Sequence, residues 1–126
     1  MDSRYLEVAE ISAILQRGNT VECFLGACSR DGKPGVRWLS LEGTNRISVY
    51  IYETADLGSA EKSDLYEFGP LNSTLPFGDS DEELNFADLK GCLRLLGSRF
   101  PGSITRLVNE GGIQDEYADF ISKGRK

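Results

Sequence analysis

Three strand-like runs separated by short turns constrain the fold of this chain more than any other feature of its sequence. The runs VECFLGAC (21–28), VRWLSL (36–41) and RISVYIYE (46–53) are rich in β-branched and aromatic residues. The intervening segments RDGKPG (30–35) and EGTN (42–45) contain the residues that favour tight turns. Because a parallel return needs a crossover of about a dozen residues, the runs are predicted to form an antiparallel β meander.

Residue alternation in these runs predicts two different sheet faces. In the third run, apolar residues alternate with Ser48, Tyr50 and Tyr52, so one face is apolar and the other mixed. We expect Trp38 to be a core residue whose indole N–H finds one hydrogen-bond partner.

Helical patterns precede and follow the meander. Residues 3–17 are predicted to form a helix that Ser3 can cap and that Gly18 ends. Near the C-terminus, residues 101–111 and 113–124 have the spacing of two short helices.

A further helix is predicted over 80–97, where Ser80 and Glu83 form a capping box and the acidic residues 81–83 occupy the positive first turn. The chain is therefore predicted to be one α+β domain over 1–126. It has an N-terminal helix, a three- to four-stranded antiparallel meander and C-terminal helices packed on one face.

An acidic, loop-rich segment, 53–86, is inserted between the sheet and the C-terminal helices. It contains nine acidic residues and one lysine, a charge of −8 in a chain whose net charge is −6. LYEF (65–68) is a possible fourth, edge strand, and the rest of 54–79 reads as loop. A connection this long in a compact domain is usually functional or disordered.

The composition excludes several kinds of chemistry. The chain has no histidine, which removes the commonest general base and metal ligand. Cys23, Cys28 and Cys92 form no CxxC pair, so we expect buried thiols rather than a disulfide framework or a zinc site. An EF-hand loop starting at Asp79 would place Leu84 and Lys90 where Gly and Glu are required. We therefore expect no metal and no cofactor.

Hydropathy indicates neither a membrane segment nor a secretory signal. No apolar run approaches about 18 residues, and the N-terminal stretch MDSRYLEVAE contains acidic residues. We therefore expect a cytoplasmic protein that does not bind a membrane. The negative field of the middle third also argues against a nucleic-acid partner.

The acidic segment is interpreted as a binding surface. Helix capping explains only one or two of its charges, and a solvated face is the plainer alternative for the remainder. Acidic residues interleaved with aromatic ones suit a basic protein partner, because aromatic anchors and complementary charge favour fast, tight association. The residues predicted to bind such a partner are Asp64, Tyr66, Glu67, Phe77, Asp79, Asp81, Glu82 and Glu83.

A segment near the C-terminus carries a family resemblance. GSRFPGSITRLVNEGGI (97–113) resembles a segment of immunity proteins from bacterial polymorphic and contact-dependent growth inhibition toxin systems. The resemblance implies a protein without catalytic residues that binds a cognate toxin domain and blocks its active site or substrate surface. Many such toxins are nucleases with basic substrate grooves, which an acidic surface would suit.

Two other classes of function remain compatible with the sequence. A small-molecule-binding regulator or a carboxylate-dependent enzyme would show a concave pocket and a perturbed carboxylate away from the acidic loop. Glu22, Glu42 and Glu53 are conceivable carboxylates for it, although nothing in the sequence selects them. An adaptor subunit of a larger complex would instead show a broad apolar patch.

Overall fold

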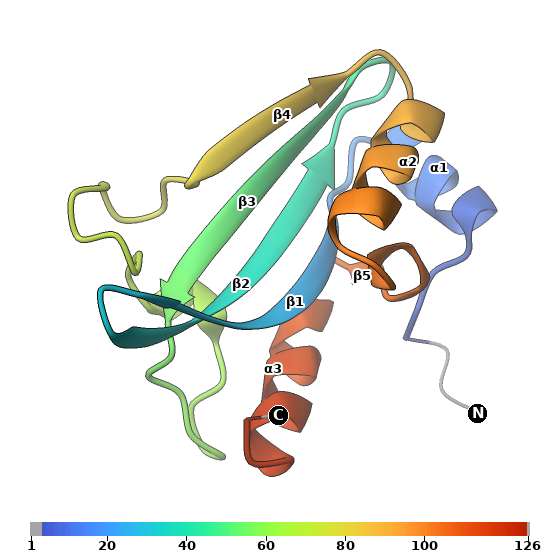
Figure 1. Cartoon of the computed structure of the whole chain (residues 1–126). Helices are drawn as coiled ribbons and strands as arrows, with labels where there is room; N and C mark the ends of the chain where they lie inside the picture. Colours follow the sequence, from blue (N-terminus) through green and yellow to red (C-terminus); the bar gives the residue numbers. More distant parts are fainter. Residues whose placement is uncertain (1–3, 126) are drawn as a thin grey trace.

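The computed structural model describes residues 4–125, and its centre is a five-stranded antiparallel sheet (Figure 1). The strand order is β4-β3-β2-β1-β5. The strands are β1 (Val21–Arg30), β2 (Lys33–Glu42), β3 (Ile47–Ala55), β4 (Glu82–Phe86) and β5 (Val108–Asn109). The three predicted runs are thus confirmed as β1, β2 and β3, which pair in the expected antiparallel order.

Three helices and two short 3₁₀ turns complete the fold. They are α1 (Val8–Gln16), η1 (Leu65–Glu67), α2 (Leu89–Arg99), η2 (Ser103–Thr105) and α3 (Gly112–Ser122). The α+β class is therefore as predicted. Among residues 4–125, no helix has the length and apolar character needed to cross a membrane.

Helices α1 and α2 cover one face of the sheet. Ile11 and Leu15 of α1 and Leu96 of α2 pack onto the apolar side of the strands, where Leu39 and Val49 are fully buried. The alternation in β3 produces this face, because successive side chains of a strand point to opposite sides of the sheet.

Helix α3 packs on the opposite face, so the expectation that the C-terminal helices share one face is wrong (Figure 1). Tyr117 and Phe120 of α3, with Leu65 of η1, contact Phe24 and Trp38 of the sheet. Around Phe24 and Trp38, the mixed face of the sheet contains enough apolar surface to bury a helix.

Residues 82–86 form a strand, so the helix predicted from Ser80 is wrong over its first part. Strand β4 pairs with β3 from Ile47↔Phe86 to Ile51↔Glu82, which satisfies backbone groups that β3 would otherwise expose as an edge. Helix α2 begins after Asp88, whose side chain accepts a hydrogen bond from the Gly91 amide at 2.8 Å. The acidic residues 81–83 are therefore not in a helical first turn.

Two further expectations need correction. LYEF is no strand, because Leu65–Glu67 form the turn η1, which Asp64 caps. The helix predicted over 101–111 is replaced by η2 and β5, and Gly102 and Gly111 adopt left-handed φ angles of 87° and 91° that interrupt it.

The N-terminal helix begins later than predicted. Its first residue is Val8, and Glu7 and Glu10 form a capping box. Ser3, the predicted cap, lies outside the described residues. The last predicted helix, 113–124, is confirmed as α3.

Candidate functional site

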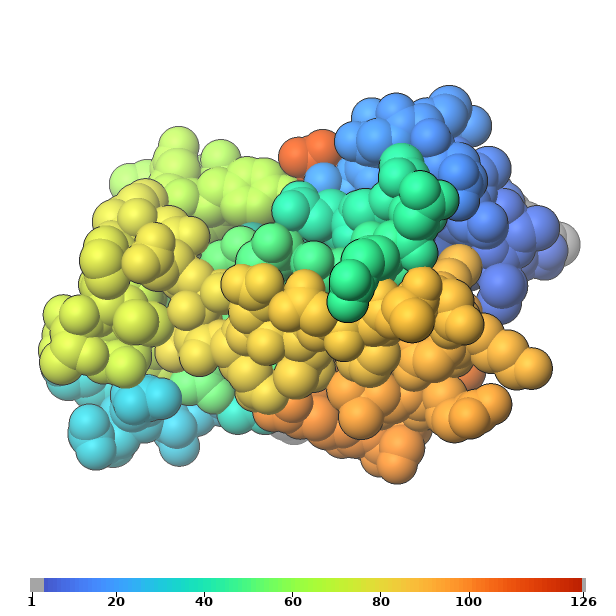
Figure 2. Space-filling view, turned by 90° about the horizontal axis from the view of Figure 1, so that it is seen from above, coloured from blue at the N-terminus to red at the C-terminus, as the bar shows by residue number. Residues whose placement is uncertain are grey.

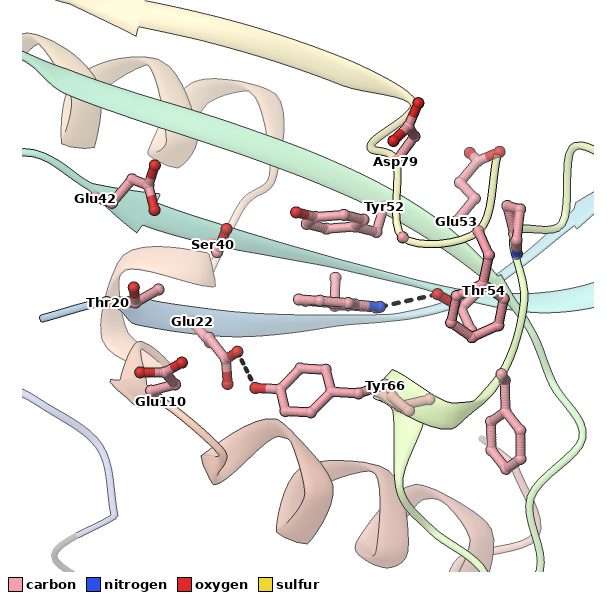
Figure 3. Close-up of a pocket in the computed structure, with 16 residues that line it drawn as sticks. Thr20, Glu22, Ser40, Glu42, Tyr52, Glu53, Thr54, Tyr66, Asp79 and Glu110 are labelled. Atoms are coloured by element: carbon pink, nitrogen blue, oxygen red, sulfur yellow. Dashed lines mark hydrogen bonds between the residues drawn. The ribbon is translucent and has the colours of Figure 1, made fainter. Parts of the chain in front are cut away.

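A cavity of about 300 Å³ opens on the sheet face that α3 covers only in part (Figure 3). Strands β1, β2 and β3 form its floor, and residues 65–79 and the turn before α3 form its sides. Its aromatic lining residues are Trp38, Tyr52, Tyr66, Phe68 and Phe77. Its acidic lining residues are Glu22, Glu42, Glu53, Asp79 and Glu110.

Trp38 is at the centre of the aromatic floor. Its ring stacks on Tyr52 with centroids 4.2 Å apart and an interplanar angle of 14°, and Tyr66 contacts it edge-on at 5.7 Å. The indole N–H donates to the Thr54 hydroxyl at 3.0 Å, so the expectation of a buried tryptophan with one partner is confirmed. Two stacked rings and one edge-on ring therefore form the aromatic floor.

Glu22 is the buried acid of the cavity, with 2% of its surface exposed. The Tyr66 hydroxyl donates to one carboxylate oxygen, and the Gly111 amide donates to the other at 2.7 Å (Figure 3). Burial raises the pKa of Glu22 above its ordinary value, although these hydrogen bonds act in the opposite direction. Glu22 thus ties η1 and the start of α3 to β1.

This arrangement also affects the acidity of the Tyr66 hydroxyl. Burial and the hydrogen bond to Glu22 raise the pKa of Tyr66 well above that of a free phenol. The tyrosine therefore keeps its proton at neutral pH and acts as a hydrogen-bond donor to the carboxylate.

Three acidic side chains are exposed at the mouth of the cavity: Glu42, Asp79 and Glu110. None of the three carboxylates forms a hydrogen bond or ion pair with residues 4–125. Within the same range, no lysine or arginine lines the cavity. The mouth is therefore an uncompensated negative surface beside an aromatic floor.

Tyr66, Phe77 and Asp79, of the predicted binding residues, line this cavity. Asp64 is not among the lining residues, and it accepts hydrogen bonds from the Tyr66 amide at 3.0 Å and the Gln114 side chain at 2.8 Å. Glu67 is exposed on η1. The loop that carries Phe77 and Asp79 gathers at the end of the molecule opposite α1 (Figure 2).

The other three predicted residues lie elsewhere. Asp81 accepts a hydrogen bond from the Glu53 amide at 2.7 Å and lies 4.0 Å from Arg30. Glu82 binds Arg99 of α2 through two contacts of 2.6 Å. Glu83 is exposed on β4, outside the cavity lining.

Ion pairs neutralise part of the acidic segment. Glu53 binds Arg37 at 2.6 Å, and Asp56 binds Arg125 at 2.8 Å, in addition to the contacts of Asp81 and Glu82. The charge of −8 between residues 53 and 86 therefore does not form one continuous surface.

Replacing Glu82 with glutamine is expected to lower the free energy of unfolding by no more than about 1 kcal/mol, because the pair with Arg99 is on the surface. Arg99 lowers the pKa of Glu82 below its ordinary value of 4.5. The difference between the two proteins should accordingly be present above that pH and disappear as the pH falls below it. Urea denaturation at several pH values measures this, with Glu83→Gln as a control that should show no change. A loss at Glu82 that persists in acid would contradict the pairing.

Sequence reasoning missed Glu110 as a site residue and named Glu22 and Glu42 only as conceivable catalytic acids. The sequence feature that could have identified the cavity floor is the mixed face of the meander. Strand alternation places Glu22, Trp38 and Tyr52 together on that face. Glu110 could not be found this way, since only the path of the chain between β5 and α3 places it beside β1.

Cys23 and Cys92 are buried as expected, whereas Cys28 is only partly buried. Burial raises the pKa of Cys23 and of Cys92 to about 12, so both remain unreactive thiols at neutral pH. Among residues 4–125, no three His, Cys, Asp or Glu side chains are grouped to hold a metal ion. The arrangement is thus suited to binding a cation through aromatic rings and carboxylates.

Comparison of the chain with protein families, with curated proteins and with solved structures finds no match.

Proposed function

We propose that this chain is a non-catalytic immunity protein that binds a cognate toxin domain with a basic surface and neutralises it. The observation that carries the proposal is the acidic mouth of the cavity, where Glu42, Asp79 and Glu110 have no partner among residues 4–125. A surface of this charge attracts a basic protein and raises its rate of association.

An exposed aromatic side chain beside the mouth supports a protein partner. Phe77 has 66% of its surface exposed and lines the cavity next to Asp79. Aromatic residues at the centre of an interface contribute much of the binding free energy when a partner covers them. Phe77 and the three mouth acids together offer both an apolar anchor and complementary charge.

The segment that resembles immunity proteins contributes to the same site. Residues 97–113 contain Glu110 at the mouth and Gly111, whose amide binds Glu22. In this proposal, the bound toxin's basic groove is covered by the acidic mouth, which excludes a nucleic-acid substrate by occupying the groove and by repulsion.

A small-molecule-binding regulator is the second candidate. Glu22 is a buried carboxylate with a raised pKa inside a concave cavity, which is the arrangement that this class of function predicts. However, the cavity lies against the acidic loop rather than away from it, which favours the protein partner.

The proposal is tested by capture from a lysate of the organism that encodes this chain, with washes at low and high salt. We expect one basic polypeptide that is retained at low salt and released at high salt. When expressed alone it should be toxic to cells, and coexpression of this chain should abolish the toxicity. A captured protein with no toxicity, or toxicity that this chain does not relieve, would overturn the proposal.

Replacing Glu42 and Asp79 together with lysine should weaken binding of this partner by about 100-fold at low salt, because the mouth then repels a basic surface. The matched control replaces Glu61 and Asp115, two exposed acids outside the cavity lining. Each pair changes four units of charge and so takes the net charge from −6 to −2. Titration calorimetry measures the affinity of each variant for the partner. Equal affinities would show that the mouth does not bind the partner.

A further inference from the structure

We propose that the cavity receives the side chain of a single arginine of the partner protein, an inference that rests on the proposed function and specifies its chemistry. Three features carry it: the aromatic floor, the carboxylates around it, and the size of the cavity.

The aromatic floor brings three rings together at close range. Tyr52 and Tyr66 both contact Trp38, with centroid separations from Trp38 of 4.2 and 5.7 Å. A planar guanidinium stacks on such rings and gains both cation–π attraction and dispersion. An ammonium group gains the first contribution but cannot stack.

The carboxylates surround this floor at two depths. Glu22 is buried, and it forms no ion pair with any of residues 4–125. Figure 3 shows Glu42 and Glu110 near Glu22 at one end of the cavity and Asp79 beside Tyr52. A carboxylate offers about four acceptor sites, and Glu22 uses one for Tyr66, one for Gly111 and one for the backbone of Ile113. An entering guanidinium could therefore pair a buried charge that the fold leaves without a cation.

The size and composition of the cavity restrict the ligand further. A volume of about 300 Å³ is at the lower end of small-molecule sites, which suits one long side chain better than a peptide strand or a nucleotide. Among residues 4–125, no three of these side chains are grouped so that they could hold a metal ion. The cavity contains no cationic lining residue among those described, so an anionic ligand would meet only repulsion.

The experiment uses Trp38, which is the single tryptophan of the chain, as a fluorescent reporter in the floor of the site. N-acetyl-argininamide is titrated into the full chain and compared with N-acetyl-citrullinamide, its neutral analogue, and with N-acetyl-lysinamide. We expect a saturable change with the arginine compound at a Kd of about 1 mM. The lysine compound should bind at least about fivefold more weakly and the citrulline compound should cause no change.

Three outcomes of this titration would overturn the proposal. The first is the absence of a saturable change up to about 10 mM argininamide, which is tenfold above the expected Kd. The second is equal binding of arginine and citrulline compounds, which would show that the positive charge is not recognised. Stronger binding of the lysine compound would likewise contradict the choice of arginine.

Variants locate the bound cation. Glu22→Gln should weaken argininamide binding by about tenfold, the loss that follows from removing one charge-assisted contact. If Glu22→Gln fails to fold by circular dichroism, the double variant of Glu42→Gln with Glu110→Gln decides, because both side chains are exposed and have no partner among residues 4–125. The control pair Glu61→Gln with Asp115→Asn should leave the affinity unchanged. Unchanged affinity in the site variants would overturn the proposal.

Failure of this inference can be told apart from failure of the proposed function. If the toxin is captured and argininamide neither binds nor competes with it, the arginine site is wrong and the immunity function stands. If argininamide binds as expected but no toxin is found, the function is wrong. The cavity would then bind a guanidinium from another source, which contradicts its assignment to a toxin side chain.

Discussion

Replacing Tyr117 with phenylalanine is expected to lower the free energy of unfolding by about 2–3 kcal/mol, a large share of the stability of a domain this small. Tyr117 is fully buried on α3. Its hydroxyl donates to the Asp56 carboxylate and accepts from the Gly58 amide at 2.8 Å. Phenylalanine preserves the ring packing and leaves both partners without this hydrogen bond, and unpaired buried polar groups are costly.

Urea denaturation measures the change, and Tyr50→Phe is the matched control. Tyr50 is only partly buried, and its hydroxyl forms no hydrogen bond with residues 4–125. The free energy of unfolding of the Tyr50→Phe variant should therefore differ from that of the original chain by less than about 0.5 kcal/mol. Similar losses at the two positions would show that the link between α3 and the 56–58 segment does not contribute to stability.

Alkaline pH provides an independent check of the same contact. Burial and the hydrogen bond to Asp56 raise the pKa of Tyr117 to about 12, whereas tyrosine in an unfolded chain has a pKa near 10. A raised pKa means that the stabilisation is complete below about pH 10 and is lost as the pH rises towards 12. Tyr117→Phe should show a smaller loss over this window. The loss that remains comes from the other groups whose pKa is raised by burial, among them Tyr66, Cys23 and Cys92.

Replacing Leu39 with alanine should have the largest effect on stability, a loss of about 3–5 kcal/mol, because a cavity remains where the side chain was. Leu39 is fully buried on the central strand β2, where it pairs with Cys23 of β1 and Ile51 of β3 beneath α1 and α2. Thermal and urea unfolding would both detect this loss of stability.

Leu57→Ala is the control for this substitution, since Leu57 has 68% of its surface exposed. It should change the free energy of unfolding by less than about 0.5 kcal/mol. A small loss at Leu39 would contradict the central position of β2 in the core.

Local sequence patterns were sufficient to predict the meander. Short turns impose antiparallel pairing, and alternation assigns side chains to faces; neither depends on distant parts of the chain. The last helix was predictable for the same reason, because Ile113, Tyr117 and Phe120 follow a helical period and are buried together.

The 80–86 segment shows where local patterns fail. Ser80 and Glu83 have the spacing of a capping box, but Leu84 and Phe86 also alternate with polar residues as in a strand. The open edge of β3 decides between the two, because pairing satisfies its backbone groups and buries Leu84 and Phe86 against the core of α1 and α2. That edge exists only once the meander has folded.

The sequence by itself determined the antiparallel meander, the α+β class and an excess of acidic residues between 53 and 86. Only the tertiary structure decided which acids remain unpaired. Arginines distant in sequence neutralise Glu53, Asp56 and Glu82. Side chains from separate elements, among them Glu42 of β2 and Glu110 after β5, instead meet Asp79 at one cavity. Charge is a property of each residue, whereas compensation depends on distance, and distances between remote residues are set only by the folded chain.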